Sequence, residues 1–491
     1  MSNDRNSAST GGAAPTGPGS GGAPGAGPTS GAPLWHGRFD QAPADELWAF
    51  TVSLPFDKRL WLDDLTGSRA HVKGLVRVGL LDGAEEAAIL DALDQVHAEF
   101  STSRFVYQPS DEDIHTAIER RVTEIAGPPG AKLHTGRSRN DQIATDLRLY
   151  TRRELMQLAN RVTLLQRTLL NRAREAGETY VPGYTHMQRA QPVLLAHHLL
   201  AHGWALFRDV DRLLDCRRRA DVSPLGAGAL AGSSLPLDPR FTAQELGFSR
   251  PFENSLDAVS DRDFVAEALF CCTLLAVHLS RVAEEVVIWS SEEVGFLRLD
   301  DRYSTGSSMM PHKKNPDIAE LTRAKAARLI GHLTGVLAML KGLPLAYNRD
   351  LQEDKEPLFD AVDQLKLALS AMSGLLETCR FDRKRMEAAA DSPYLAATDL
   401  AEWLVERGTP FRDAHALVGS LVRDSLERNV SLPELVAAHP ALGEAAAALC
   451  APGQAILRRT SPGAGGPVQV AKQMLTFQKK LEGLESRLQG Q

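Results

Sequence analysis

The chain has 491 residues, of which 43% are hydrophobic and 24% charged, and its formal net charge at pH 7 is -7. This composition is typical of a globular protein of about two to four domains, and the negative balance argues against a general nucleic-acid-binding protein, which is usually basic. Neither a run of about 18 apolar residues nor a signal peptide is evident, so we expect a cytoplasmic protein without a membrane span.

Residues 1–33 consist mostly of Gly, Ala, Pro, Ser and Thr. Such a segment cannot bury enough apolar surface to offset the entropy of ordering it, so it is predicted to be a disordered tail. An N-terminal helical domain is expected over 34–138, in short helices with breaks near Pro55 and between Gly79 and Gly83. The segment 112–115 leads into one more helix, which Gly127 ends.

The polar stretch 132–142 (KLHTGRSRNDQ) precedes a long amphipathic helix, with Asn140 or Asp141 as its expected N-cap. A proline-bounded insertion over 181–192 (VPGYTHMQRAQP) and a further helix to Arg219 follow. These begin the central domain, which we expect to span 139–385.

The clearest predicted helix runs from about Leu256 to Val294 without Gly or Pro. Its apolar residues recur at alternating spacings of three and four, which is a heptad seam, and its length approaches 60 Å at about 1.5 Å per residue. Helices of this length need partners of equal length, so a long helix bundle is expected. No β-rich segment is evident, and the predicted fold class is all-α.

The stretch 306–315 (GSSMMPHKKN) is predicted to be a loop, with a helix resuming at Asp317. Residues 343–357 (LPLAYNRDLQEDKEP) interrupt the pattern again before a helix from about Leu358 to Cys379. Shorter, alanine-rich helices predict a small C-terminal domain over 386–491.

Long helices bring distant loops to common ends, so the four polar stretches are candidates for a single site. In 306–315, Lys313 and Lys314 could stabilise an alkoxide of Ser307. A solvated basic turn explains the same residues equally well, whereas a phosphate-binding loop is disfavoured because neither lysine precedes Ser or Thr.

Two further groups of residues could have a chemical role, and each also has a purely structural explanation. His186 could act as a general acid or base, with Glu320 orienting it, or be a structural histidine. Arg137, Arg139 and Asn140 could bind a carboxylate, or form a surface turn.

His198 and His202 lie four residues apart on one predicted helix, a spacing that suits metal ligands. The H-E-x-x-H glutamate is absent and no third ligand is evident, so no metal is expected. The five cysteines are scattered and lack a C-x-x-C pair, which favours buried thiols in a reducing compartment over disulfides or zinc ligation. They are Cys216, Cys271, Cys272, Cys379 and Cys450.

The chain resembles argininosuccinate lyases, members of the fumarase/aspartase superfamily, from about residue 34 to its C-terminal region. GSSMMPHKKN is similar to the signature loop of the superfamily, whereas KLHTGRSRNDQ, YTHMQRAQP, NSLDAVSDRDF and LPLAYNRDLQEDKEP resemble motifs particular to argininosuccinate lyases. The resemblance implies a homotetramer with a twenty-helix bundle and active sites assembled from three subunits. It also implies reversible cleavage of argininosuccinate to arginine and fumarate without metal or organic cofactor.

Carried over by motif, Ser307 would be the base, with Ser308 its nearest competitor, in a mobile lid over 302–316. Lys313 and Asn315 would stabilise the aci-carboxylate, and His186 with Glu320 would protonate the leaving nitrogen. The succinate portion would contact Thr185, Ser138, Arg139 and Asn140. The other substrate groups would contact Ser53, Asp57, Asp113, Tyr347, Gln352 and Lys355.

His312 occupies a position where argininosuccinate lyases commonly have Gln, and an M-P-H-K pattern is familiar from adenylosuccinate lyases. A lyase for adenylosuccinate is therefore the nearest rival, although Asp57 and Asp113 suit a cationic arginine moiety better than a purine. A non-catalytic protein on the same scaffold, as in the related lens crystallins, predicts loss of a catalytic residue, yet Ser307, His186, Lys313 and Glu320 are all present.

Overall fold

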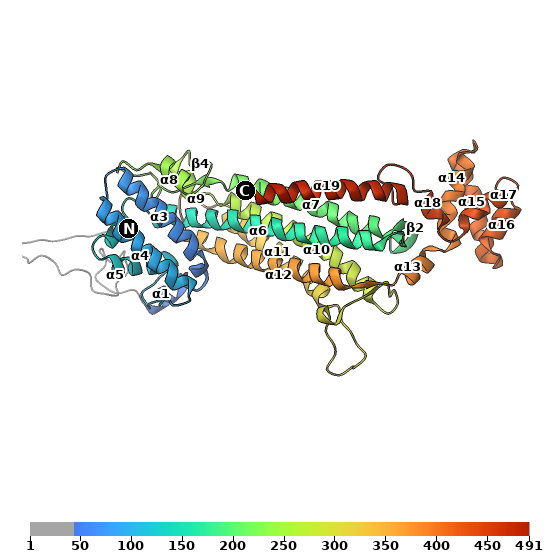
Figure 1. Ribbon diagram of the computed structural model, residues 1–491, viewed down its shortest axis with the longest axis horizontal. Helices are drawn as coiled ribbons and strands as arrows, with labels where there is room; N and C mark the ends of the chain where they lie inside the picture. The colour runs from blue at the N-terminus through green and yellow to red at the C-terminus, as the bar shows by residue number, and fades with distance from the viewer. Residues whose placement is uncertain (1–43, 491) are drawn as a thin grey trace, which may run out of the picture.

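The computed structural model describes residues 44–490, so the predicted tail over 1–33 lies outside the described residues. The described chain is elongated, with short helices at each end and a bundle of long helices between them (Figure 1). The all-α prediction is confirmed, with three short two-stranded sheets added to it.

Five helices form the N-terminal end: α1 (Asp45–Thr51), α2 (Leu54–Asp57), α3 (Trp61–Arg77), α4 (Gly83–Ser101) and α5 (Ile114–Ala126). The predicted breaks are present, although Pro55 lies in the first turn of α2, where its missing N–H costs nothing. Asp82 and Glu85 form a capping box that starts α4, and Asp113 caps α5. Helix α3 joins this end to the bundle because it packs against both α4 and α6.

The bundle contains six long helices: α6 (Arg139–Ala176), α7 (Leu195–Arg219), α10 (Asp263–Ser290), α11 (Asp317–Leu340), α12 (Lys355–Thr378) and α19 (Pro467–Gln489). The heptad prediction holds for α10, since all eight seam residues are buried: Val265, Ala268, Cys272, Leu275, Leu279, Val282, Val286 and Trp289. By length and composition α10 could cross a membrane, but more than half of its most apolar window is buried within the protein, as expected of a core helix.

The prediction of one continuous helix over 256–294 is wrong. The chain forms α9 (Ser255–Ser260), turns at Asp261 and Arg262, and then starts α10. Asp261 has an extended backbone, and the fully buried Arg262 side chain reaches the carboxylate of Asp354. This buried ion pair fixes the turn, and α10 is about 42 Å long rather than 60 Å.

The insertion over 181–192 is an antiparallel hairpin of β1 (Tyr180–Thr185) and β2 (Gln188–Leu194) between α6 and α7. The other strands are short pairs: β3 (Val222–Ser223) with β4 (Arg250–Pro251), and β5 (Leu297–Arg298) with β6 (Arg380–Phe381). Helix α8 (Pro239–Glu245) lies before β4.

Six short helices follow α12: α13 (Arg383–Ala390), α14 (Ala397–Val405), α15 (Phe411–Arg428), α16 (Leu432–Ala438), α17 (Gly443–Ala447) and α18 (Gln454–Leu457). Residues from 396 to 450 form a separate apolar core. The last helix, α19, instead packs on α6 and α7, and its Val470, Phe477 and Leu481 belong to the bundle core. The domain boundary at 386 stays a prediction, but α19 lies with the bundle.

Candidate active site

A cavity of about 270 Å³ lies where the N-terminal helices meet the start of α6 and the segment before α12. Six of the predicted substrate-binding residues line it: Ser53, Asp113, Arg139, Asn140, Tyr347 and Gln352. Four stretches that are far apart in the sequence therefore share one pocket.

Two helix N-termini form one wall of this pocket. Asp113 caps α5 by accepting a hydrogen bond from the Thr116 N–H at 2.6 Å. The N-cap of α6 is Ser138, so the prediction of Asn140 or Asp141 is wrong by two or three residues. Asp141 instead accepts from the Ser138 N–H and from the N–H groups of Gly226 and Gly228, which ties α6 to the 223–239 loop.

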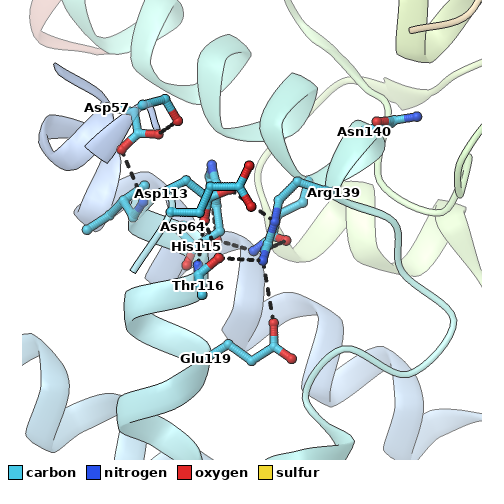
Figure 2. Close-up of polar contacts among 12 residues, drawn as sticks. Asp57, Asp64, Asp113, His115, Thr116, Glu119, Arg139 and Asn140 are labelled. Atoms are coloured by element: carbon cyan, nitrogen blue, oxygen red, sulfur yellow. Dashed lines mark hydrogen bonds and ion pairs between the residues drawn. The ribbon is translucent and has the colours of Figure 1, made fainter. Parts of the chain in front are cut away.

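Arg139 and Asp113 face each other across these two helix starts (Figure 2). Their Nε and Oδ2 atoms are 3.3 Å apart, and the guanidinium also donates to Thr116 Oγ1 at 3.2 Å. Burial alone would raise the pKa of Asp113, but Arg139, His115 and the Thr116 hydrogen bonds lower it below its usual value. The pocket thus presents a carboxylate that stays ionised beside a fixed cation.

A second carboxylate, that of Asp57, lies beside the pocket at α2 and is hydrogen-bonded to Ser53. The Ser53 hydroxyl donates to Asp57 Oδ2 at 2.6 Å, and the Ile114 N–H donates to Oδ1 at 3.1 Å. Burial raises the pKa of Asp57 above its ordinary value. Asp57 therefore holds two parts of the pocket wall in place, Ser53 and the start of α5.

The segment before α12 closes the opposite side. Arg349 donates to the Thr51 carbonyl at 2.7 Å and to Glu112 Oε1 at 2.8 Å, and Gln352 donates to the same carbonyl at 3.4 Å. Burial raises the pKa of Tyr347, so its phenol stays protonated. This segment carries two predicted residues, Tyr347 and Gln352, and one that the prediction missed, Arg349.

Lys355 lies behind this wall rather than among the residues that line the cavity. Its ammonium donates to Asp354 Oδ1 at 2.9 Å, and Arg262 donates to the other carboxylate oxygen at 2.5 Å. All three side chains are almost fully buried. In one chain, Lys355 is therefore part of a buried ion cluster at the start of α12.

A buried network beneath the pocket was also missed from the sequence. His115 Nδ1 lies 3.2 Å from Asp64 and 3.2 Å from Asp146, and Gln142 donates to Asp64 (Figure 2). Although burial opposes it, the two carboxylates raise the pKa of His115 to about 10. The position of His115 two residues after Asp113 was the available signal, because it places the imidazole in the first turn of the same helix.

One cavity-lining residue, His134, stays neutral. Burial, together with Arg137 and Arg139, lowers its pKa to about 3. It lies in the 132–142 stretch, before the three residues that the sequence had suggested as carboxylate-binding, and nothing in its spacing distinguished it.

Thr185 and His186 lie at the tip of the β1–β2 hairpin. His186 and Met187 form its two-residue turn with φ of 53° and 59°. Positive φ at both positions is the type I′ geometry that favours Asn and Gly, so the turn keeps two larger residues in a strained conformation. Both Thr185 and His186 are exposed.

The segment 301–316 projects from the side of the bundle as a long loop (Figure 1). A bridge between Thr305 and Asn315 closes its base. At its tip the Ser307 hydroxyl oxygen accepts hydrogen bonds from the Met309 N–H at 3.2 Å and the Met310 N–H at 3.0 Å. Lys314 is bound to the Leu299 carbonyl and to Asp301.

Most of the other predicted site residues in this loop and at the start of α11 are more exposed to solvent than Ser307. Lys313 and Ser308 are exposed, as is Glu320 on α11, and the Asn315 amide lies 3.5 Å from the Gly306 carbonyl. Within residues 44–490 of one chain, Glu320 makes no ion pair with His186.

Of the four polar stretches that are candidates for a single site, only two are brought together in the pocket by one chain. The 132–142 and 343–357 stretches meet in the pocket, but the hairpin follows the far end of α6. That helix has 38 residues and is about 57 Å long, so Arg139 and His186 are too far apart for one small ligand.

Comparisons with known proteins agree on the family. The pattern of the family described as Lyase matches residues 37–331, and that of the argininosuccinate lyase C-terminal region matches 394–449. The argininosuccinate lyase of Roseiflexus castenholzii is 51% identical over 90% of this chain and 98% of its own length. That of Frankia casuarinae is 51% identical over 91% and 98%. A crystal structure of EDDS lyase in complex with formate superposes with a TM-score of 0.79 at 29% identity, covering 92% of this chain and 93% of the other.

Proposed function

Because the chain belongs to the argininosuccinate lyase family, we propose that it cleaves argininosuccinate reversibly to L-arginine and fumarate by β-elimination. The observation that carries this proposal is identity of about half over nine-tenths of the chain with argininosuccinate lyases. The chain is a carbon–nitrogen lyase, and the reaction serves arginine biosynthesis. Its five buried free thiols are consistent with the cytoplasm as its compartment.

Ser307 is the base in this proposal. Two backbone N–H groups point at its oxygen, and such donors stabilise an alkoxide as the hydroxyl proton is lost. The alkoxide takes a proton from the carbon adjacent to a carboxylate of the succinate portion. Lys313 and Asn315 stabilise the aci-carboxylate that receives the electron pair. These two donors to Ser307, together with the exposure of Ser308, support Ser307 rather than Ser308 as the base.

The electron pair then forms the carbon–carbon double bond of fumarate as the carbon–nitrogen bond breaks. His186 delivers a proton to the departing guanidinium nitrogen, and Glu320 of another subunit orients the imidazole. Both side chains, His186 and Glu320, are exposed within a single subunit, so each is available for a contact with another subunit.

The pocket at the start of α6 holds the substrate. Ser138, Arg139, Asn140 and Thr185 contact the succinate carboxylates, for which a guanidinium fork is well suited. Asp113 and Asp57, with Ser53, complement the cationic arginine portion, and Ser308, Tyr347 and Gln352 contact the remaining groups. Lys355 acts from behind the pocket wall, through its ion pair with Asp354.

A homotetramer completes the site. The length of α6 separates Arg139 from His186, so residues of both regions reach one substrate only when different subunits contribute them. Pairing of long helices between subunits, as in a twenty-helix bundle, places the hairpin, the loop and the pocket of different chains together.

The proposal is tested by following the ultraviolet absorbance of fumarate when purified protein meets argininosuccinate, with adenylosuccinate in parallel. Fumarate from argininosuccinate alone is the expected result. Cleavage of adenylosuccinate alone would mean that His312 is the better guide to the substrate, and activity on neither would favour the non-catalytic scaffold.

Subunit mixing tests the shared site. His186→Gln and Ser307→Ala proteins are each expected to be inactive, but refolding them together should restore part of the activity, because some sites then receive both intact residues. Continued inactivity of the mixture would contradict assembly from separate subunits.

A further inference from the structure

A group of three side chains on the bundle lies outside the proposed active site and has the composition of a metal site. His198 and His202 are four residues apart on α7, so both imidazoles project from the same face of the helix. Their ring centroids are 5.7 Å apart. The sequence showed the spacing of this pair, but no metal was expected there because no third ligand was evident.

The third ligand is Glu285, which comes from α10, more than 80 residues further along the chain. Its Oε2 lies 2.6 Å from His198 Nε2 and 2.7 Å from His202 Nε2. The three candidate ligand atoms all lie within 4.8 Å of one another. Packing of α7 against α10 therefore creates a cluster that neither helix contains alone.

We propose that His198, His202 and Glu285 bind a divalent transition-metal ion, with Zn²⁺ as the preferred one. Two imidazole nitrogens and one carboxylate oxygen suit zinc and its neighbours, whereas magnesium and calcium favour all-oxygen sites. The ion would link the first turns of α7 to the last turns of α10. This site takes no part in the elimination.

The geometry needs only a small adjustment to receive the ion. Bonds of about 2.0–2.1 Å in a tetrahedral site place ligand atoms about 3.3 Å apart. Glu285 Oε2, now 2.6 and 2.7 Å from the two nitrogens, would move back by a fraction of an ångström. His198 and His202 lie on one face of α7, so rotation of their side chains can bring both nitrogens to the ion.

The surroundings allow entry and hold the ligands. The side chains of His198, His202 and Glu285 are 25%, 16% and 35% exposed, so solvent reaches the cluster and can supply a fourth ligand. Trp289, one turn after Glu285, packs on the His198 ring with centroids 4.9 Å apart. Such outer contacts fix ring orientation at metal sites.

The test uses tag-free full-length protein, stripped with a chelator and dialysed against Zn²⁺, with bound metal measured by elemental analysis. One ion per chain is expected. His202→Gln and Glu285→Gln should each weaken binding by at least about 100-fold, since even partners outside the ligand set typically account for 10–100-fold. His197→Gln is the matched control, because this neighbour on α7 contacts Gln473 instead.

Thermal unfolding provides a second readout. Zn²⁺ should raise the Tm of the unaltered protein and of His197→Gln, because a ligand that binds the folded state stabilises it, and should leave the two ligand variants unchanged. Absence of a site in the unaltered protein, or retention of full affinity by both ligand variants, would overturn the proposal.

Discussion

The pocket at the start of α6 and the loop over 301–316 differ in how much of their structure one chain supplies. Asp113 and the His115 network are buried, Arg139 is half-buried, and each is held by several side-chain contacts. The loop is mostly exposed, and its tip is ordered by the backbone bonds to Ser307. The difference is that one chain holds the proposed substrate-binding groups in place, whereas it leaves the proposed reacting groups of the loop exposed.

The largest effect is expected from a substitution in the 301–316 loop, which should lower activity but leave stability nearly unchanged. Ser307→Ala should lower kcat by about 10²–10⁴-fold, the usual contribution of a general base, and change stability by less than about 0.5 kcal/mol, because the residue lies on an exposed loop. Steady-state kinetics and thermal unfolding measure the two quantities. Ser308→Ala is the matched control and should lose much less. If Ser308→Ala is the more damaged variant, the assignment of the base is reversed.

The pocket side should show the opposite pattern, a loss of stability. Asp354→Asn leaves Arg262 and Lys355 buried without their carboxylate, which should lower the free energy of unfolding by about 3–5 kcal/mol. Asp363→Asn is the control, because its partner Arg59 is 36% exposed and such a pair is worth about 1 kcal/mol or less. Urea unfolding measures both, and equal losses would show that burial does not distinguish the two pairs.

A smaller effect concerns pH and the His115 network. The folded-state pKa of His115, about 10, lies above its unfolded value of about 6.5, so its stabilising contribution is complete below pH 6.5 and is lost as pH rises through 10. The Tm should therefore fall across this range. Burial and Asp64 raise the pKa of Asp146 to about 8, so this carboxyl titrates in the same range and adds to the fall; Asp146→Asn removes both its charge and its titration and should flatten the fall. A Tm that is constant from pH 6.5 to 10 would contradict an imidazolium at this position.

The sequence predicted the helices most reliably where their signal is local. The seam of α10 and the Gly127 stop of α5 depend on neighbouring residues, and both are present. The cap of α6 was misplaced although its signal is local: Ser138 and Asp141 form a capping box, in which Asp141 is the third helical residue rather than the cap. The β1–β2 hairpin was not predicted, since His186 and Met187 lack the Asn-Gly signal of a type I′ turn.

The sequence by itself determined the all-α class and the long helices, and it supplied the residues proposed to carry the chemistry, because helical period and motif composition are read along the chain. Only the tertiary structure decided which of those residues meet. It placed Glu285 between His198 and His202, His115 between Asp64 and Asp146, and α19 on the bundle. These contacts come from packing between helices distant in sequence, for which an apolar stripe indicates burial but does not specify the partner.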